Sequence, residues 1–472
     1  MGRSGRVRAV LAAAGVVAMV SAGTAVPGSA APALAAPGGP GVFGFGSNPA
    51  GDLGDGTTTA SDSPVPASGL PGPVRQVAAG YFTSAALLSD GTVWAWGANA
   101  SGVMGNGTTS DSVTTPQQVP GLSAITQIAL GIGDAYALRS DGTLWAWGFN
   151  NSGQLGNGTT VASYRPVQVP GLTGITQVSA GTGYVLAVRS NGTVWAWGGN
   201  SVGELGDGTT TNRLVPERVP GLTGIVSVTA EFPSFAVRSD GTLFSWGDNS
   251  EGELGHGTSG GFTVTPAPVP GLTGVTQVAS GGGAVLAVVG SAGAVWAWGM
   301  NGCGQLGDGT TVSRTSPERI PPIGVTQVAT GLNGGSAAVR SNGTLLTWGC
   351  NAFGQLGNGD SGQFEAPPAA VRSLTGVMQV VFGGGVFGGG YGLVVGSQAY
   401  STVPSLVGLT PTAAGQRLQA ANLVLGTETP VVDNTCNDIG RVMSQSPAAG
   451  AVLVGGSAVS ITIGQRPSHP CP

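Results

Sequence analysis

The chain has 472 residues, of which 87 are glycine, 41% are hydrophobic and only 8% are charged. That balance excludes an intrinsically disordered chain, which combines high charge with low hydrophobicity, and it favours an all-β protein dense in turns. The 17 basic residues are all arginine and face 22 acidic residues, which gives a net charge of −5. Because phosphate binding needs a basic patch, we expect no nucleic-acid partner.

The first 35 residues are predicted to be a secretory signal peptide. Three arginines precede an apolar stretch over residues 9–26, and Ala33-Leu34-Ala35 offers a cleavage site. An uncleaved membrane anchor is the alternative, because Pro37 lies so close to the cleavage point. No later stretch of about 20 apolar residues could span a bilayer. We therefore expect an exported protein, secreted or associated with the cell wall, with no transmembrane segment after cleavage.

Residues 36–400 are organised by seven copies of one motif, an aromatic-glycine pair followed by a turn and Leu-Gly-Asp/Asn-Gly or a close variant. Successive pairs are 51, 51, 50, 49, 52 and 50 residues apart. The pairs are Phe45-Gly46, Trp96-Gly97, Trp147-Gly148, Trp197-Gly198, Trp246-Gly247, Trp298-Gly299 and Trp348-Gly349. Such a period indicates an array of equivalent units, each of which buries its apolar faces against its neighbours.

Residues 74–124 illustrate one unit. Residues 74–80 alternate with period two and end on glycine, which predicts a first strand. Residues 84–88 are almost wholly apolar, as expected of a strand covered on both faces. Asp90-Gly91 favours a tight hairpin into a third strand over residues 93–96.

The two ends of the repeat array carry complementary fragments. The first-strand element occurs seven times, beginning at Val74, Ile125, Ile175, Ile225, Val275, Val325 and Val377. Residues 42–56 lack the preceding strands of their unit, and residues 377–395 lack the following ones. We therefore predict that the two half-blades join and close a seven-bladed β-propeller with no exposed sheet edge.

The pattern Trp-Gly-x-Asn-x-x-Gly-Gln-Leu-Gly-Asp/Asn-Gly, clearest at 147–158 and 298–309, resembles the regulator of chromosome condensation repeat family. The resemblance covers about residues 42–395 and implies a seven-bladed propeller. The eukaryotic founder is a nuclear guanine-nucleotide exchange factor that docks on nucleosomes. This chain departs from it in its predicted export signal, its acidity and Gly131-Ile132-Gly133-Asp134, where the family often has a histidine. We expect the fold to carry over but not the exchange activity.

Residues 401–466 have a different texture and predict a small α+β domain, followed by a short tail over residues 467–472. Thr410-Pro411 suits the first positions of a helix, and the apolar residues that follow are spaced at helical intervals. Strand-like runs cover residues 441–447 and 458–463.

This second segment resembles a PASTA domain, the module attached to penicillin-binding proteins and bacterial serine/threonine kinases. The matching residues are 403–408, 444–450 and 456–459. The resemblance implies an extracellular bacterial location and, in some members, contact with peptidoglycan. Other members act only as spacers, so both interpretations stay open for a single copy.

Four cysteines fit an exported protein. We expect a bridge between Cys303 and Cys350, which occupy nearby points of neighbouring repeats, and a second between Cys436 and Cys471. Free thiols and a metal site are the alternatives. Zinc is the weakest of them because the chain has no Cys-x-x-Cys and only two histidines, which are far apart in sequence.

The sequence offers no catalytic constellation, and we expect no enzyme, no cofactor and no metal. His256 occupies the Asp/Asn position of one Leu-Gly-x-Gly copy, so a turn variant is favoured over a catalytic base. Carboxylates such as Asp55, Asp207 and Asp308 alternate with asparagine at equivalent turns, which indicates backbone capping rather than calcium binding.

Functional variation is expected in the loops of one propeller face. These loops carry larger or charged residues where sibling repeats have small ones, and such residues are candidates for a binding surface. The candidates are Tyr81, Phe82, Asp134, Phe149, Tyr184, Glu231, Phe232, Met300 and Phe353. Local packing over the blade ends is the alternative for each of them.

Together these features predict a non-enzymatic, monomeric, exported binding or scaffold protein. The propeller would be a protein-interaction platform, and residues 401–466 would bind peptidoglycan or act as a spacer. A secreted inhibitor of an enzyme is the alternative, because a known exported inhibitor of β-lactamases is a seven-bladed propeller of related, shorter repeats. Exchange-factor activity and wall hydrolysis are less favoured.

Overall fold

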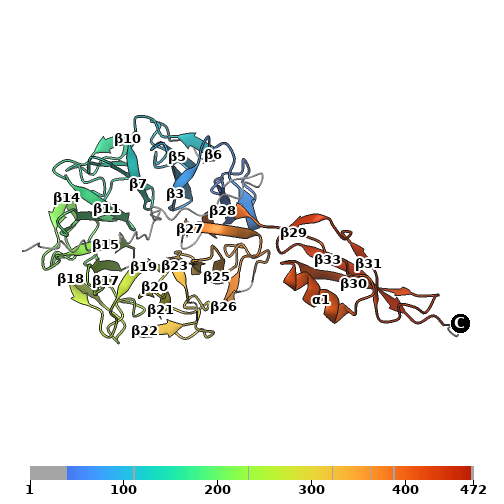
Figure 1. Cartoon of the computed structure of the whole chain (residues 1–472). Coiled ribbons are helices and arrows are strands. Elements are labelled where there is room, and N and C mark those ends of the chain that lie inside the picture. Colours follow the sequence, from blue (N-terminus) through green and yellow to red (C-terminus); the bar gives the residue numbers. More distant parts are fainter. Residues whose placement is uncertain are drawn as a thin grey trace, which may run out of the picture.

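The computed structural model describes residues 40–468 apart from 110–111, 232, 322, 363 and 386–388. These residues form a disk of radial blades and a smaller second domain (Figure 1). The predicted signal peptide, Phe232, His469 and Cys471 lie outside the described residues. Within the described ranges, no helix is long and apolar enough to cross a membrane.

The described part of the disk consists of seven four-stranded sheets, which confirms the predicted all-β, seven-bladed propeller. Seven strands surround the axis: β3 (Val74–Ala79), β7 (Ile125–Leu130), β11 (Ile175–Ala180), β15 (Ile225–Ala230), β19 (Val275–Gly281), β23 (Val325–Thr330) and β27 (Leu374–Gly385). The second strands are β4 (Thr83–Leu88), β8 (Asp134–Arg139), β12 (Tyr184–Arg189), β16 (Ser234–Arg238), β20 (Ala284–Val289), β24 (Gly335–Arg340) and β28 (Gly389–Gln398). The second strands are covered on both faces, which explains their apolar runs.

The outer half of each blade contains the aromatic-glycine motif and a solvent-facing edge. The third strands are β5 (Val93–Ala98), β9 (Leu144–Gly148), β13 (Val194–Gly198), β17 (Leu243–Asp248), β21 (Ala294–Gly299), β25 (Leu345–Gly349) and β1 (Gly41–Gly46). The outermost strands are β6 (Ser112–Gln118), β10 (Ser163–Gln168), β14 (Arg213–Arg218), β18 (Phe262–Pro268), β22 (Arg314–Ile320), β26 (Glu365–Ala370) and β2 (Ser61–Pro66). Sequence patterning did not predict these outermost strands, since they are short, exposed and rich in proline, threonine and serine.

The two ends of the repeat array share one sheet. Its strand order is β2-β1-β28-β27, and β1 pairs antiparallel with β28 from Gly41 opposite Gly396 to Gly46 opposite Tyr391. The predicted closure by two half-blades is therefore confirmed.

A ladder of glutamines joins neighbouring blades around the axis. Gln76 Nε2 donates to the carbonyl of Ile128 (2.8 Å), and Gln76 Oε1 accepts from the N–H of Ile128 (2.9 Å). Gln379 makes the same pair with Val77, 302 residues away, and so closes the ring. The other members of the ladder are Gln127, Gln177, Gln277 and Gln327. Each bonds both backbone polar groups, the N–H and the C=O, of one residue in the neighbouring inner strand.

The junction between the fourth and fifth blades lacks this glutamine. Ser227 occupies its position, and a single bond from Thr229 Oγ1 to the carbonyl of Val278 (3.2 Å) replaces the pair. We expect Ser227→Gln to raise the free energy of unfolding by about 1–2 kcal/mol, because it adds two buried hydrogen bonds. Thermal unfolding measures this, with Gln177→Ser as the matched reverse change. A lower melting temperature for Ser227→Gln would contradict the ladder.

The repeated tryptophan also joins adjacent blades. Trp96 is fully buried and donates its indole N–H to the carbonyl of Asp52, directly before the Leu-Gly-Asp-Gly turn of the preceding blade (2.8 Å). The indole lies so close to Gly54 that a Cβ there would be 2.8 Å from Nε1, which explains the glycine of that turn. In the junction where Phe45 replaces tryptophan, the ring lies against Gly357 in the same way.

The second domain has its own core. The helix α1 (Pro411–Ala420) starts as predicted, with Thr410 as N-cap and Pro411 at the first position. It packs over a three-stranded sheet of β30 (Val424–Val432), β33 (Ala458–Gln465) and β31 (Val442–Ser446). Two short strands, β29 (Tyr400–Thr402) and β32 (Val452–Val454), form a separate pair. The strands β30, β29 and β32 were not predicted.

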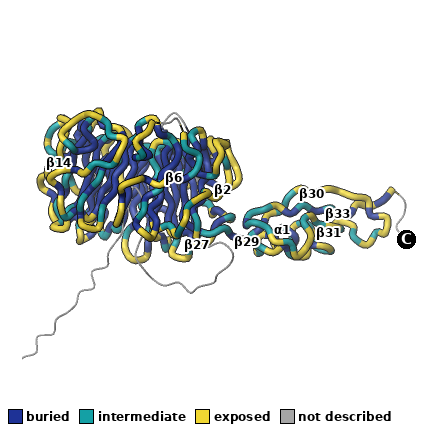
Figure 2. Tube along the Cα trace, turned by 90° about the horizontal axis from the view of Figure 1, so that it is seen from above, coloured by how far each residue is buried: buried dark blue, intermediate teal, exposed yellow. Residues whose placement is uncertain are grey.

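The second domain lies beside the disk and covers neither face, as the two perpendicular views show (Figures 1 and 2). Asn422 Nδ2 donates to the carbonyl of Arg372 (3.0 Å), and Gly455 N–H donates to the carbonyl of Ala399 (2.8 Å). Arg372 lies just before β27 and Ala399 directly follows β28, in the blade that closes the ring. Both acceptors therefore lie at the opposite end of that blade from the loops that follow the inner strands.

Candidate binding face

Two sets of loops meet on one propeller face, which we call the loop face. They are the turns between the inner and second strands and the turns after the aromatic-glycine pairs. Phe149 N–H bonds the carbonyl of Gly133, and Met300 N–H bonds that of Gly283, each at 2.8 Å. The prediction that the two sets share a face is therefore confirmed.

Four predicted surface residues are exposed on the loop face. The exposed fractions are 40% for Tyr81, 37% for Phe149, 38% for Met300 and 46% for Phe353. Phe82 is half-buried, and its ring lies edge-on to that of Tyr81 with the centroids 4.7 Å apart. These apolar side chains occupy loops of different blades, so they surround the axis rather than form one cluster.

Two other predicted surface residues are buried, so their assignment to the surface was wrong. Tyr184 begins β12 with no exposed area, and its hydroxyl bonds the carbonyl of Glu231 in the next blade. Asp134 begins β8, also with no exposed area. Both positions were placed in the loops, but the second strands begin with these residues and turn their side chains into the blade junctions.

The inner strands end around a narrow pit at the centre of the loop face. Seven equivalent residues line it: Gly80, Gly131, Gly181, Glu231, Gly281, Gly331 and Gly383. A Cβ at Gly80 would lie 2.6 Å from the carbonyl oxygen of Gly131, so close approach of the blades requires glycine there. The pit has about 30 Å³ for water, enough for about two molecules.

Glu231 is the one residue of this ring with a side chain. It is half-buried, and burial raises the pKa of its carboxyl to about 8. Among the described residues, none gives this carboxyl group a hydrogen bond or an ion pair. The sequence singled Glu231 out as a loop residue, but the pit itself was not predicted.

Burial favours the protonated form of Asp134. Burial raises the pKa of its carboxyl to about 7, and Oδ1 has no hydrogen-bond partner within the described residues. The hydroxyl of Tyr136 lies 2.7 Å from both Asp134 Oδ2 and the carbonyl of Gln154. Because a phenol has one proton, it donates either to the ionised carboxylate of Asp134 or, when Asp134 is protonated and donates to the phenol oxygen, to Gln154.

This proton makes stability depend on pH. An unfolded Asp134 loses its proton near pH 4, whereas the folded group keeps it to about pH 7, so stability falls as pH rises between these values. Asp52 and Glu231 contribute slopes of the same sign, since burial raises their pKa values to about 7 and about 8. We therefore expect Asp134→Asn to remove its own share of the slope and raise the melting temperature at pH 8, because asparagine donates to Tyr136 without ionising. Thermal unfolding from pH 4 to 8 measures it. Asp90→Asn is the control with the opposite sign, since hydrogen bonds from Thr92 lower the pKa of Asp90. An unchanged slope in Asp134→Asn would refute the assignment.

His256 is a turn residue, as predicted. Its Nε2 lies 3.1 Å from Ser245 Oγ, but that serine is fully buried and donates to the carbonyl of Leu254 (2.8 Å). Thr347 makes the equivalent bond to Leu356 (2.9 Å) in a blade that carries asparagine instead of histidine. The Ser–His pair is therefore a structural contact, because a substrate has no access to the buried serine.

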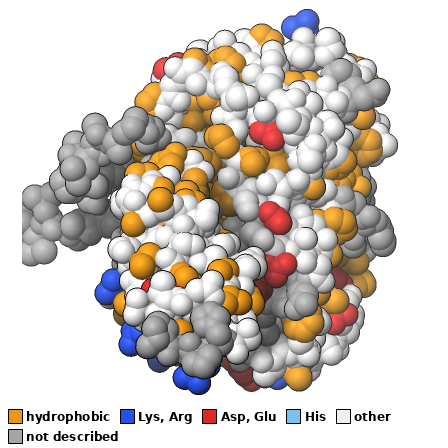
Figure 3. Space-filling model, turned by 90° about the vertical axis from the view of Figure 1, so that its right-hand side faces the viewer, with side chains coloured by type: hydrophobic (Ala, Val, Ile, Leu, Met, Phe, Trp, Pro, Cys, Tyr) orange, Lys and Arg blue, Asp and Glu red, His pale blue; other side chains and the backbone are white. Residues whose placement is uncertain are grey.

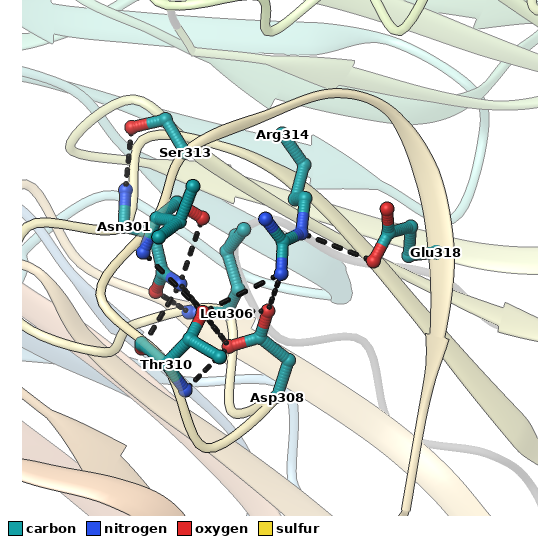
Figure 4. Close-up of polar contacts among 8 residues, drawn as sticks. Asn301, Leu306, Asp308, Thr310, Ser313, Arg314 and Glu318 are labelled. Carbon is teal, nitrogen blue, oxygen red and sulfur yellow. Dashed lines mark hydrogen bonds and ion pairs between the residues drawn. The ribbon is translucent and has the colours of Figure 1, made fainter.

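The repeated turn carboxylates cap backbone groups. Figure 4 shows Asp308 accepting from Thr310 N–H (2.9 Å) and paired with Arg314 (2.8 Å), while Asn301 Oδ1 accepts from Leu306 N–H (2.9 Å). The same bond to a threonine N–H is made by Asn106 in another blade. In the described part of the chain, no group of three or more His, Cys, Asp or Glu could hold a metal ion.

The predicted Cys303–Cys350 bridge is present, with an S–S distance of 2.00 Å. It joins loops of adjacent blades on the loop face, where Cys350 N–H bonds the carbonyl of Gly334 (3.0 Å). The second predicted bridge, between Cys436 and Cys471, stays a prediction because Cys471 lies outside the described residues.

Solved propellers share this architecture. Prp20p from Saccharomyces cerevisiae superposes with a TM-score of 0.68 at 22% identity, covering 76% of this chain and 92% of that one. Human WBSCR16 gives a TM-score of 0.67 at 24% identity, covering 75% and 99%. At these identities the likeness shows the fold alone.

Curated relatives match only short stretches. The human probable E3 ubiquitin-protein ligase HERC3 is 39% identical over 85 residues, which is 18% of this chain and 8% of that protein. The ultraviolet-B receptor UVR8 of Arabidopsis thaliana is 33% identical over 120 residues, 25% of this chain and 27% of that protein. The chain thus matches less than a third of either relative.

Two families account for the described domains. The PASTA domain family matches residues 401–465, in agreement with the helix and three-stranded sheet. The RCC1-like domain matches residues 41–388, which span the blades from β1 to the loop face of the closing blade. The chain therefore belongs to the RCC1-like domain family and carries a PASTA domain after its propeller.

Proposed function

We propose that this protein is an exported, non-enzymatic binding protein that docks a partner protein on the loop face and contacts peptidoglycan through its PASTA domain. The observation that carries the proposal is the set of four exposed side chains, Tyr81, Phe149, Met300 and Phe353, on a face that the PASTA domain leaves open. Large apolar anchors dominate protein interfaces.

The PASTA domain supports the second half of the proposal. Helix α1 covers one face of its sheet, with Leu418, Val459 and Ile461 in the core. The other face carries hydroxyl groups, among them Ser444 Oγ and Thr462 Oγ1, which lie 2.8 Å apart. Residues 401–466 contain three arginines and three acidic residues, so this domain has no net charge. Figure 3 shows few charged side chains among many uncharged ones on the side facing the viewer. A neutral, hydroxyl-rich surface suits a glycan more than a polyanion.

The protein-binding half is tested with the loop face. Replacing Tyr81, Phe149, Met300 and Phe353 together by alanine should change the melting temperature by only a few degrees, because these side chains are exposed. The same variant should lose any partner that the unaltered protein captures from culture medium. Replacing Tyr164 and Phe262, exposed on outer strands, is the matched control and should keep the partner. If the partner is an enzyme that loses activity on binding, the propeller is an inhibitor.

The wall-binding half is tested by sedimentation with purified peptidoglycan. The full chain should co-sediment weakly, because one small domain offers little interface. Thr429 and Ser444 both pair with Thr462 across the sheet, so Thr429→Arg combined with Ser444→Arg should abolish sedimentation. Arg417→Gln, on helix α1, is the control and should sediment like the unaltered chain. Equal sedimentation of the double-arginine variant, the control and the unaltered chain would rule out contact through this sheet face and leave the spacer role.

A further inference from the structure

The axial pit combines one carboxyl group with a ring of glycines and an apolar border. Glu231 stands where the six sibling blades have glycine, so the departure is confined to one blade. Tyr81, Ile132 and Leu332 also line the pit. The lining contains no arginine or histidine among the described residues, so no cation of the lining neutralises Glu231.

An unpaired carboxyl group at the end of a narrow, half-buried pit is costly to ionise, and burial holds the pKa of Glu231 near 8. A cation of the right size would remove that cost. The space of about 30 Å³ admits a group the size of one or two water molecules, which fits an ammonium group and is tight for a planar guanidinium.

Part of the lining is apolar, from Tyr81, Ile132 and Leu332, and this part fits the methylene groups of a lysine side chain. Lysine buries its four methylene groups along apolar surface while its ammonium reaches a polar partner. Tyr81, which lines the pit and is partly exposed, also offers an aromatic ring to which a cation is attracted. The protein itself contains no lysine, so the occupant has to come from another molecule.

We propose that the axial pit of the loop face receives a lysine side chain from the partner protein, whose ammonium group pairs with the carboxylate of Glu231. The inference rests on the proposed function and deepens it, because it names the chemistry of the partner's central contact. The exposed side chains around the axis then form the surrounding ring of the interface, and the lysine fixes its centre.

The other titratable groups near Glu231 are few. Tyr81 lines the pit, Asp134 lies behind Gly131, and Tyr184 bonds the Glu231 carbonyl. Burial raises the pKa of Tyr184 well above its usual range and that of Asp134 to about 7. Asp52, whose pKa burial also raises to about 7, ionises in the same range. Asp134→Asn combined with Asp52→Asn is therefore the background in which lysine binding should strengthen as pH rises from 6 to 9, because Glu231 ionises.

The test uses the peptide acetyl-Gly-Gly-Lys-Gly-Gly-amide with the full chain, followed by ligand-observed NMR at low salt. We expect broadening of the lysine ε-methylene signal, and at least a fivefold loss of affinity for Glu231→Gly. That variant should fold, because glycine is the residue of the sibling blades. Glu251→Gln, an exposed carboxylate on the same face, is the matched control and should bind normally.

The proposal would be overturned if the lysine peptide bound Glu231→Gly as tightly as the unaltered chain. It would also be overturned if a peptide with norleucine in place of lysine bound the unaltered chain equally well. If a peptide with arginine in place of lysine bound more tightly than the lysine peptide, the choice of lysine would be overturned. A partner that Glu231→Gly still captures, but that the four-alanine variant loses, would refute the pit while leaving the proposed function intact. If both variants still capture the partner, the proposed function is refuted.

Discussion

Removal of residues 1–67, which deletes β1 and β2, should open the ring and unfold the propeller near room temperature. The deletion takes away the β28 partner strand and the buried side chains of Val42, Phe43, Phe45 and Leu53. At about 1.5–3 kcal/mol for each large buried side chain, the loss is roughly 6–12 kcal/mol. That is comparable to the whole stability of an ordinary domain.

Thermal unfolding followed by near-ultraviolet circular dichroism measures this result, because six tryptophans donate their indole N–H across blade junctions. Removal of residues 1–39 alone is the control and should leave the melting temperature unchanged, since the described sheet begins later. We also expect the longer deletion to aggregate, because it exposes the edge of β28. A deletion that melts with the full chain would mean that the half-blades do not close the ring.

The repeat made the fold predictable. A period near 50 residues, with complementary fragments at the two ends, fixed the number of blades before any contact was known. The glutamine ladder was missed although its signal is visible: glutamine recurs at the third position of six inner-strand elements, and Ser227 interrupts it. A side chain that bonds the backbone of the next blade leaves no hydrophobic pattern, so periodicity alone does not reveal it.

The binding face was only partly predictable. Tyr81, Phe149, Met300 and Phe353 were found because they are large residues where siblings are small. The same rule failed for Tyr184, since a residue that differs from its siblings can equally fill a junction between blades. The pit needed the structure, because it is formed by glycines that approach one another from distant segments.

Loss of the Cys303–Cys350 bridge is the second large effect that we expect. The bridge closes a segment with a sequence separation of 47, and a cross-link of that length stabilises by about 4 kcal/mol through the unfolded chain. The native loops are held independently. Gln305 Oε1 accepts from Cys303 N–H (2.8 Å), and the carbonyl of Gln305 accepts from the Trp348 indole (2.9 Å). The folded state should therefore change little when the bridge is removed.

Cys303→Ala combined with Cys350→Ala should lower the propeller melting temperature by roughly 5–10 °C while leaving the loop face competent to bind. Differential scanning calorimetry under non-reducing conditions measures the shift, and the PASTA domain, with its own core, provides the internal reference. The stabilisation arises in the unfolded state. If the two bridged blades meet early in folding, removal of the bridge should therefore lower the rate of folding more than it raises the rate of unfolding. An unchanged melting temperature would show that the bridge does not restrict the unfolded chain as the loop-closure argument requires.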